Sequence, residues 1–585
     1  MSEAQNARSE AAPTSPTQLG PSRSWLEAHS DVAASAIVLI GMAVRIRAAQ
    51  GTFLNPDEAL HYFIANRASW SQMYQASLTM AHPPLLFGLL YLWRHIGSSE
   101  FVLRLPSVLA GTAFCWIFFK WMKQVFGLAP AWIALILVTL LPSLVALSTE
   151  IRQYEWLLLF AASAAYLLEK ALAQNSALCV LFSSLCLYGA MLSHYSAFLF
   201  AATMGLYGLW RVLGRMASPG LRATWIAGQM GAIGLGIALY VTHIVHIRNT
   251  TMAEAALDTW LYKSYLHPGQ NPLLFMVARS FSVFQYLFGQ RLIGDLAALA
   301  FLVGVFLLLR RKVLLPYSGP TRPQSAVLLV LPFVLNCAAA LADAYPYGGT
   351  RHCVFLVIFA IAGVSLFLAK VTQQRVLRGV AVAIVITLLC LVFPSRHQPY
   401  IARADQTLTH MQDAMAFVRQ QVSTSDTIFV DYETGILFAY YMCERQPVSY
   451  DASPPGFLLF RCGGHRIIST SHDLWFFTPQ KFLGQWDALL RSGQFRAGDG
   501  VWVGQAGFNV TLDEELRGEF PEFHNLQTQT FGHNIRLFRI TVGQPMPQAA
   551  TMQRSGVQGI AGGPIPLLYP RHGSYRYSDP VRRAI

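Results

Sequence analysis

The sequence predicts an α-helical polytopic membrane protein with about eleven to thirteen transmembrane helices and a small extracytoplasmic α/β domain at its C-terminal end. Of the 585 residues 54% are hydrophobic and only 12% are charged, whereas soluble domains carry about 25% charged residues. Apolar residues form long runs, for example at 128–147, 292–309, 326–342 and 380–393. A helix needs about 20 largely apolar residues to cross a bilayer, and most of these runs approach that length.

Residues 1–31 are rich in Ser, Ala and Pro, a composition typical of disordered segments. The apolar run that follows, 32–44, has the length of a signal-peptide core. Its long, partly acidic leader and the flanking Arg45 and Arg47 argue against cleavage. We therefore interpret this run as an uncleaved first transmembrane helix after a disordered cytoplasmic N-terminus.

Short basic loops predict the orientation, because Lys and Arg concentrate on the cytoplasmic side of membrane proteins. These loops lie at 120–123, 170, 211–222, 310–322 and 370–378. The outer segments are then 55–82, 149–154, 193–195, 243–291 and 343–352, together with the chain after 394. We expect a multi-pass protein of the cell inner (plasma) membrane, with a cytoplasmic N-terminus and a periplasmic or extracellular C-terminal domain.

This orientation allows one crossing between the first outer loop, 50–100, and the basic loop at 120–123. The run 101–121 supplies it, so 85–93 is expected to form an interfacial or re-entrant helix that is too short to cross. The number of spans is then about eleven. Crossings at 85–96 and 273–288 would raise it to about thirteen and leave both ends on the same sides.

The net charge of +13 does not indicate nucleic-acid binding. The basic residues are spread over short loops, and no basic patch with interleaved aromatic residues is visible. No Gly-rich phosphate loop is visible either.

Ionisable residues collect instead at the predicted outer face, in loops that are distant in the sequence. The candidate site residues are Asp57, Glu58, His82, Arg104, Glu150, Arg152, Tyr154 and Arg351. A transport path would more commonly place such groups near the bilayer midplane. The pattern therefore favours a site at the membrane surface.

Asp57 and Glu58 are the sharpest candidates for chemistry. Adjacent carboxylates repel, which tends to raise the pKa of one of them and make it a usable proton acceptor. The same residues also suit a helix start, with Asn55 or Asp57 as the N-cap and Glu58 favoured by the helix dipole. The two interpretations are compatible.

The other candidates have simple structural explanations beside the functional ones. His82 is held in extended geometry by the prolines after it, which a turn before a helix also explains. Arg152 and Tyr154 head a predicted helix, where an Arg either reaches lipid headgroups or grips a ligand phosphate bidentately. The same alternatives apply to Arg45, Arg47, Arg104 and Arg351.

Four motifs follow one another in the chain. They are Asp57-Glu58, His82-Pro83-Pro84-Leu85, Ser99-Glu100-Phe101 with Arg104-Leu105-Pro106-Ser107, and Glu150 with Arg152 and Tyr154. In this order and spacing the chain resembles the bacterial GT-C superfamily of membrane glycosyltransferases, namely the dolichyl-phosphate-mannose protein mannosyltransferase-like enzymes, which include the aminoarabinose transferases. The similarity runs over 32–393 and is strongest over 54–160.

The resemblance implies inverting transfer of a sugar from a polyprenyl-phosphate donor to an acceptor (glycan, lipid or protein) at the outer face of the membrane. Asp57 looks like the family's catalytic carboxylate, and Glu58 would orient the acceptor or share the proton. Arg104 and Arg152 would offset charge on the leaving phosphate. The resemblance places the remaining candidates in the same pocket: His82, Glu150, Tyr154 and Arg351.

The chain also departs from the family in places. The aminoarabinose branch has Lys-Pro where this sequence has His82-Pro83, so the safest expectation is a bacterial enzyme of unidentified acceptor. No cofactor is certain; a divalent cation between Asp57, Glu58 and the carrier phosphate would suit oxygen ligands, although no separate metal-ligand cluster is visible. A lipid-carrier flippase or other transporter, and a non-catalytic subunit of a polysaccharide assembly system, stay open as alternatives.

The composition changes after residue 393. Predicted helices at 402–422, 434–442 and 481–491 alternate with predicted strands at 427–431, 466–469, 500–504 and 534–541, which indicates a soluble α/β domain over 395–543. Cys443 and Cys462 lie in this domain, where a disulfide is permitted but not required. Residues 544–585 are rich in Pro, Gly and Arg and are expected to form a disordered tail.

Overall fold

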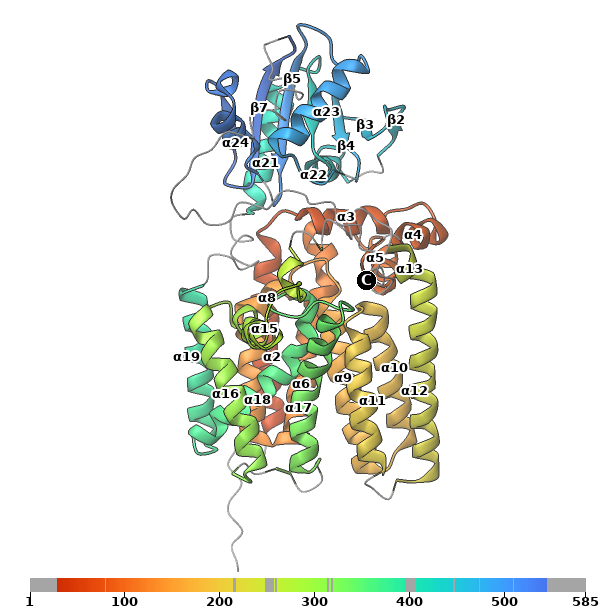
Figure 1. Cartoon of the computed structure of the whole chain (residues 1–585), viewed down its shortest axis with the longest axis vertical. Coiled ribbons are helices and arrows are strands. Elements are labelled where there is room, and N and C mark those ends of the chain that lie inside the picture. The colour runs from red at the N-terminus through yellow and green to blue at the C-terminus, as the bar shows by residue number, and fades with distance from the viewer. Residues whose placement is uncertain are drawn as a thin grey trace, which may run out of the picture.

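The computed structural model of the protein describes residues 29–543, except 79, 214–216, 248–256, 258–259, 313–314, 317–318, 395–405, 446–447, 473 and 509. The predicted disordered ends, 544–585 and nearly all of 1–31, lie outside these residues. Figure 1 shows a bundle of upright helices with an α/β unit at one end. Short helices of the first outer loop lie between the two parts.

Seven helices among the described residues are long and apolar enough to cross a membrane. They are α2 (Ser30–Gln50), α6 (Glu100–Phe126), α9 (Tyr154–Gln174), α12 (Pro219–Leu239, continued to Ile247), α16 (Arg291–Leu309), α17 (Arg322–Leu341) and α18 (Val357–Val371, with the 3-10 turn Arg351–Leu356 before it). The bent pair α7 (Leu128–Leu140) and α8 (Pro142–Ser148) makes an eighth. The prediction of a polytopic helical membrane protein is therefore confirmed.

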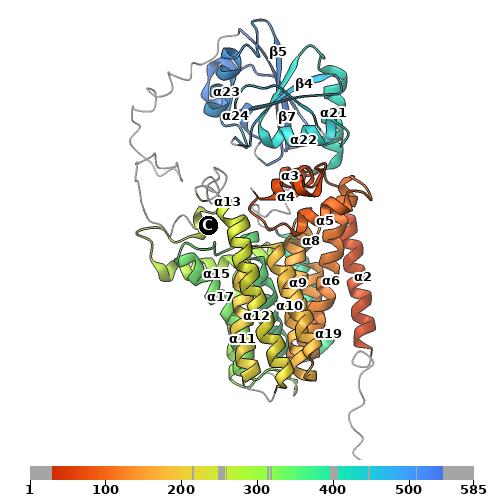
Figure 2. The ribbon, with the colours of Figure 1, turned by 90° about the vertical axis from the view of Figure 1, so that its right-hand side faces the viewer.

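Four shorter apolar helices complete the bundle: α10 (Ala177–Ser193), α11 (Ala197–Leu213), α15 (Pro272–Phe288) and α19 (Val376–Val392). Each has 17 residues, or about 25 Å of helix. Figures 1 and 2 show α10, α11 and α19 upright beside the longer spans, whereas α15 runs across the bundle axis in the half of the bundle nearer the α/β unit. If α10, α11 and α19 also cross the membrane, the described helices give the lower of the two span counts expected above.

The break between α7 and α8 has a local cause and a specific compensation. Pro142 begins α8 and has no N–H to offer the carbonyl of Val138, and the chain bends by 59° there. The buried Arg45 of α2 donates to the carbonyl oxygens of Val138 at 3.0 Å and Thr139 at 2.9 Å. Backbone groups inside a bilayer need such hydrogen-bond partners. Arg45 therefore satisfies carbonyl groups at the helix break and does not bind lipid headgroups.

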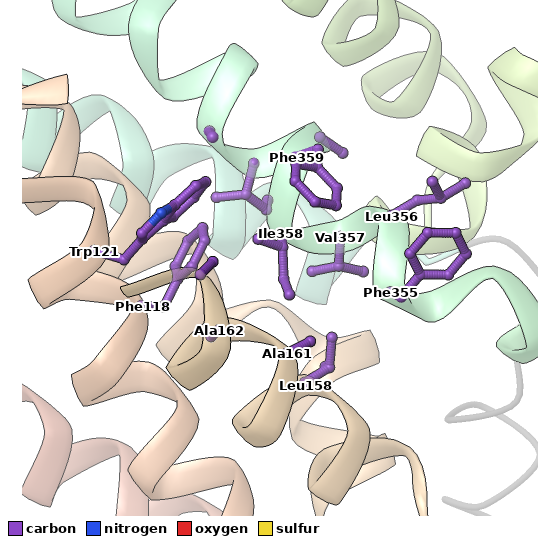
Figure 3. Close-up of a cluster of buried hydrophobic side chains, with 14 of the residues drawn as sticks. Phe118, Trp121, Leu158, Ala161, Ala162, Phe355, Leu356, Val357, Ile358 and Phe359 are labelled. Atoms are coloured by element: carbon purple, nitrogen blue, oxygen red, sulfur yellow. The ribbon is translucent and has the colours of Figure 1, made fainter. Parts of the chain in front are cut away.

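The centre of the bundle is closely packed, as Figure 3 shows. Trp121 of α6 meets Phe359 of α18 edge to face, with ring centroids 6.5 Å apart. Ala161 and Ala162 of α9 are fully buried in the same cluster, and their small side chains allow the helices to approach. Within a bilayer, close packing rather than hydrophobic burial brings helices together.

Three short helices of the first outer loop cover one end of the bundle (Figure 2): α3 (Pro56–Ala65), α4 (Trp70–Ser77) and α5 (Leu85–Trp93). With nine residues, α5 is about 14 Å long. That is half of the hydrocarbon thickness, so α5 does not span it, as the sequence predicts.

The α/β unit contains a seven-stranded sheet in the order β2-β3-β4-β1-β5-β7-β6. The strands are β1 (Thr427–Val430), β2 (Tyr450–Asp451), β3 (Phe457–Cys462), β4 (His465–Thr470), β5 (Gly500–Ala506), β6 (Thr528–Thr530) and β7 (Ile535–Thr541). The central β1 pairs in parallel with β4 and β5, and the outer pairs are antiparallel. The small α/β fold is confirmed, although β2, β3 and β6 were not predicted.

Helices cover both faces of this sheet. α21 (Leu408–Gln421) and α22 (Tyr432–Met442) share a core with the first outer loop. α23 (Pro479–Arg491) and α24 (Leu512–Glu519) form a second core on the other face. A disulfide joins Cys443, just after α22, to Cys462 at the end of β3, which resolves the pairing left open above.

Candidate active site

The start of α3 is set by Asn55, Pro56 and Glu58. Asn55 Oδ1 accepts the Glu58 N–H at 2.9 Å, and Glu58 Oε2 accepts the Asn55 N–H at 3.0 Å. Pro56 lies in the first turn, where a missing N–H is tolerated. This capping box confirms the helix-start interpretation, with Asn55 as the cap. Because successive residues of a helix lie about 100° apart, Asp57 and Glu58 face different surroundings.

Glu58 points into the protein and is fully buried with Arg104 of α6. Its oxygens accept from Arg104 Nε at 2.8 Å, from Arg104 Nη2 at 2.7 Å and from the Ile151 N–H at 2.9 Å. The guanidinium also donates to the carbonyl oxygens of Ala49, Thr52 and Phe53. The pair therefore links α3 and α6 to the end of α2 and to the loop between α8 and α9.

Asp57 faces a different side of α3 and is held by two arginines from distant parts of the chain. Its Oδ2 atom lies 2.8 Å from Nη2 of Arg152, in the loop before α9, and 2.8 Å from Nη2 of Arg351, in the 3-10 turn before α18. The Asp57 side chain is 21% exposed and that of Arg351 32%. A charged ligand can therefore reach this cluster, unlike the closed Glu58–Arg104 pair.

The electrostatics of Asp57 differ from those expected for adjacent carboxylates. Burial acts to raise the pKa of the Asp57 carboxyl, but the guanidinium groups of Arg152 and Arg351 outweigh it and hold this pKa well below its usual range. The predicted rise through repulsion by Glu58 is wrong, because each carboxylate has its own arginine partners. Asp57 is consequently ionised at neutral pH.

A row of four imidazoles lies beside the Asp57 cluster. The ring centroids are 5.8 Å apart for His61 and His82, 5.8 Å for His82 and His194, and 5.9 Å for His194 and His352. All but His352 are buried. Burial and the charge of Arg152 lower the pKa of His61 to about 3 and that of His82 well below its usual value. His61 and His82 are therefore neutral.

His61 has the most defined hydrogen-bonding state of this row. Its Nδ1 lies 3.0 Å from the Ile151 carbonyl oxygen, which can only accept, so Nδ1 carries the proton and Nε2 is a bare acceptor. Among the described residues this buried Nε2 has no hydrogen-bond partner. His61 is four residues after Asp57 and so lies on the same face of α3.

The remaining predicted residues also surround Asp57 and its arginines. The ring of Tyr154 lies 5.6 Å from the Arg152 guanidinium carbon and 6.0 Å from that of Arg351. Glu150 lies close enough to Arg351 to interact with it electrostatically. The structure thus brings together Asp57, His82, Glu150, Arg152, Tyr154 and Arg351, while Glu58 and Arg104 form the closed layer beneath them.

Three residues of the cluster were not predicted as site residues: His61, His194 and His352. For His61 the signal was available, since its spacing from Asp57 is that of one helix face. His194 and His352 lie in outer loops recognised as polar. Their approach to His82 depends on how α10 and α18 pack, which no local pattern encodes.

The described residues do not suit a divalent cation at this site. No group of three or more His, Cys, Asp or Glu among them is placed to hold a metal ion. Glu58, one of the two carboxylates considered for such an ion, already accepts N–H groups from Arg104, Asn55 and Ile151.

Fold and site together define a polytopic membrane protein with a carboxylate–arginine–histidine cluster at one end of its helix bundle. Residues 81–248 match the family model described as dolichyl-phosphate-mannose-protein mannosyltransferase. This match confirms, over that part of the chain, the resemblance found from the motifs. It includes His82, Arg104, Glu150, Arg152 and Tyr154, while Asp57, Glu58 and Arg351 lie outside it. No curated protein matches the chain.

Several solved structures of membrane glycosyltransferases align with the chain at low identity. ArnT of Cupriavidus metallidurans bound to undecaprenyl phosphate is 11% identical, with a TM-score of 0.49 over 89% of this chain and 100% of that one. The oligosaccharyltransferase AglB of Archaeoglobus fulgidus, in complex with an inhibitory peptide and a dolichol-phosphate, is 12% identical, with a TM-score of 0.46 over 90% and 75%. Arabinosyltransferase EmbB of Mycobacterium smegmatis is 14% identical, with a TM-score of 0.39 over 67% and 41%.

Proposed function

We propose that the protein transfers a sugar from a polyprenyl-phosphate donor to an acceptor hydroxyl at the outer face of the cytoplasmic membrane. The observation that carries this proposal is the contact of one Asp57 oxygen with both Arg152 and Arg351. Two guanidinium groups that converge on one carboxylate oxygen also form a ready site for a phosphate. A base and a phosphate site therefore lie within one hydrogen bond of each other.

In the proposed reaction the donor phosphate takes the place of Asp57 at the two arginines. The acceptor oxygen then attacks the anomeric carbon, the bond from that carbon to the phosphate oxygen breaks, and the acceptor proton passes to Asp57. The electron pair leaves with the phosphate, whose charge Arg152 and Arg351 stabilise. Attack opposite the leaving group inverts the anomeric centre.

Other residues support this step without taking part in it. Glu58 and Arg104 act as positioning residues, since their closed pair holds α3 and the loop that carries Arg152. These positioning roles differ from those that the resemblance implies, which were orienting the acceptor or sharing the proton for Glu58 and offsetting the phosphate charge for Arg104. The buried imidazoles of His61 and His82 stay neutral beside the Asp57 cluster and do not compete with it for the arginines. Tyr154 and Glu150 hold the arginines in place.

The carrier's apolar chain also finds a suitable surface. A groove of about 450 Å³ runs between α2, α8 and α19 and is lined mainly by aliphatic side chains. Thr52 and Thr149, which also line it, are five residues before Asp57 and three before Arg152 in the chain. A polyprenyl chain in this groove would place its phosphate near the arginines.

The proposed location follows from the position of the site. The basic residues Lys120 and Lys123 pair with Asp31 at the N-terminal end of α2, and Asp57 follows the other end of that helix. With basic ends on the cytoplasmic side, the site and the α/β unit face the periplasm or cell exterior. We propose a membrane domain over 32–394 and a soluble domain over 395–543.

The proposal predicts release of free polyprenyl phosphate from a donor by the purified full-length protein. The assay offers a panel of polyprenyl-phosphate sugars, with host lipid extract as acceptor, and measures released carrier phosphate and labelled product. Arg152→Gln is expected to abolish most turnover, whereas the matched change Arg310→Gln, at the opposite end of the bundle, leaves it intact. Folded wild-type protein that releases carrier phosphate from none of the donors would favour the transporter or non-catalytic alternatives.

The proposal also predicts different pH profiles for kcat/KM and kcat, because Asp57 has different neighbours in the free enzyme and in the donor complex. In the free enzyme the arginines hold the pKa of Asp57 low, so kcat/KM for the donor should stay level as the pH falls from about 8 to about 4. In the complex the arginines bind phosphate and an anion lies nearby, both of which raise this pKa. Protonated Asp57 cannot accept a proton, so kcat should fall at acidic pH. If kcat and kcat/KM fell in the same way at acidic pH, the donor phosphate would not replace Asp57 at the two arginines.

A further inference from the structure

The α/β unit contacts the helix that carries Asp57 through α22. The Tyr441 hydroxyl accepts the Leu54 N–H at 2.8 Å, just before α3 begins. The Tyr62 hydroxyl of α3 donates to the Arg445 carbonyl oxygen at 2.8 Å, just after α22 ends. The rings of Tyr62 and Tyr440 meet edge to face, 5.2 Å apart. Figure 1 shows α3 directly beside α22.

The chain that enters the unit also pairs with the segment before α3. The Phe53 N–H donates to the Gln406 carbonyl oxygen at 3.1 Å, and the Leu408 N–H donates to the Gly51 carbonyl oxygen at 3.0 Å. From the membrane side, Arg104 donates to the carbonyl oxygens of Thr52 and Phe53. Residues 51–54 are therefore held by hydrogen bonds from both sides.

The first turn of α3 is also in contact with the sheet end of the unit. Gly507, after β5, has a φ of +124°, which favours glycine. A Cβ added there would clash first with the Glu433 carboxylate of α22 and would lie 2.6 Å from Pro56 Cγ. The backbone of the unit therefore lies against the residue next to Asp57, with no space for a larger side chain.

Helix α22 and the residues just after it also contact the start of α6, the helix that carries Arg104. The Tyr440 hydroxyl donates to the Ser98 carbonyl oxygen at 2.6 Å, and Arg445 pairs with Glu100 at 3.1 Å. Ser98 and Glu100 flank the start of α6. Phe53 and Leu54 share one buried core with Leu437, Phe438 and Tyr440 of α22. The interface is thus a packed core and not a loose contact between two domains.

We propose that α22 positions Asp57 for catalysis, with Tyr441 and Arg445 as positioning residues that act through α3. This inference rests on the proposed function and assigns a role to the α/β unit, which the family match does not cover. The disulfide from Cys443 to Cys462 ties the C-terminal end of α22, beside Arg445, to β3. It keeps the Arg445 carbonyl in reach of Tyr62. A small displacement of a reacting group can lower a rate about a hundredfold.

Tyr441→Phe tests this role, because it keeps the ring and leaves the Leu54 N–H without its acceptor. The full-length variant is expected to lose kcat by roughly tenfold to a hundredfold, with KM for the donor unchanged, since the arginines are untouched. Hydrogen exchange over residues 53–62 should accelerate. The matched control is Tyr450→Phe, whose ring on β2 is 52% exposed and which should leave kcat and exchange unchanged.

Gly507→Ala provides a second variant. Its methyl group would press on Pro56 and on the Glu433 carboxylate, which accepts the Phe508 N–H, and it should lower kcat in the same way. A Tyr441→Phe protein with wild-type kcat, or with wild-type exchange over 53–62, overturns the inference. Wild-type protein without transfer activity would instead contradict the proposed function. In that case exchange over 53–62 still reports whether α22 holds α3, so the two failures are distinguishable.

Discussion

Asp57→Asn is expected to lower sugar transfer by at least a hundredfold, the range for loss of a general base. Asparagine has nearly the same shape as aspartate and keeps an oxygen that Arg152 and Arg351 can bind, but it cannot accept the acceptor's proton. The measurement is the rate of carrier-phosphate release at saturating donor and acceptor. The matched control is Asp451→Asn, which makes the same substitution on the exposed strand β2. The Asp451 side chain is 60% exposed, and this variant should retain wild-type activity.

Measuring donor binding shows whether Asp57 acts as a general base, or only supports folding or binds the phosphate. The Asp57 carboxylate contacts both arginines and would compete with a phosphate for them. A neutral amide competes less, so Asp57→Asn should bind the donor at least as tightly as wild type while kcat falls. Equal carrier-phosphate release by both proteins would remove Asp57 from the mechanism. Loss of donor binding together with kcat would instead make it part of the phosphate site.

Arg104→Met is expected to destabilise the protein by about 3–5 kcal/mol, the effect of leaving one partner of a buried ion pair uncompensated. Glu58 would remain fully buried without its guanidinium, and the carbonyl groups of Ala49, Thr52 and Phe53 would lose their donor. The double change Glu58→Leu with Arg104→Met removes both charges and should recover part of this loss. Thermal unfolding of the purified variants measures both effects.

Lys123→Met is the matched control for this pair. Lys123 and Asp31 form an ion pair at the other end of the bundle, with side chains 35% and 47% exposed. Exposed pairs contribute about 0–1 kcal/mol, so this change should shift the melting temperature little. If Arg104→Met were no more harmful than Lys123→Met, the Glu58–Arg104 pair would not hold the site.

Local patterns predicted much of the fold because each depends on one stretch of chain. A run of about 20 apolar residues has few alternatives to a membrane span, since lipid leaves no other partner for backbone polar groups. The nine residues of α5 were correctly expected not to cross. In the α/β unit, β1, β4, β5 and β7 were anticipated, whereas the edge strands β2 and β6 are too short to give a pattern.

The candidate site was anticipated as a set of residue types at one membrane face, but not as an arrangement. Asp57 and Glu58 are neighbours in the chain and therefore looked like one coupled pair. Their helix turns them about 100° apart, towards Arg152 and Arg351 in one direction and Arg104 in the other. The burial of a carboxyl group and the charged groups around it set its pKa, and neither follows from the identity of the neighbouring residues in the chain.

Hydrophobic run length and charge are local properties, so they were enough to predict the membrane class, the apolar spans, the α/β end of the chain and the gathering of ionisable residues at one face. Which carboxylate meets which arginine, the row of four histidines from three outer segments, and the contact of α22 with α3 depend on the folded arrangement. These contacts join residues up to hundreds of positions apart. They depend on how helices pack, which is a property of the whole fold.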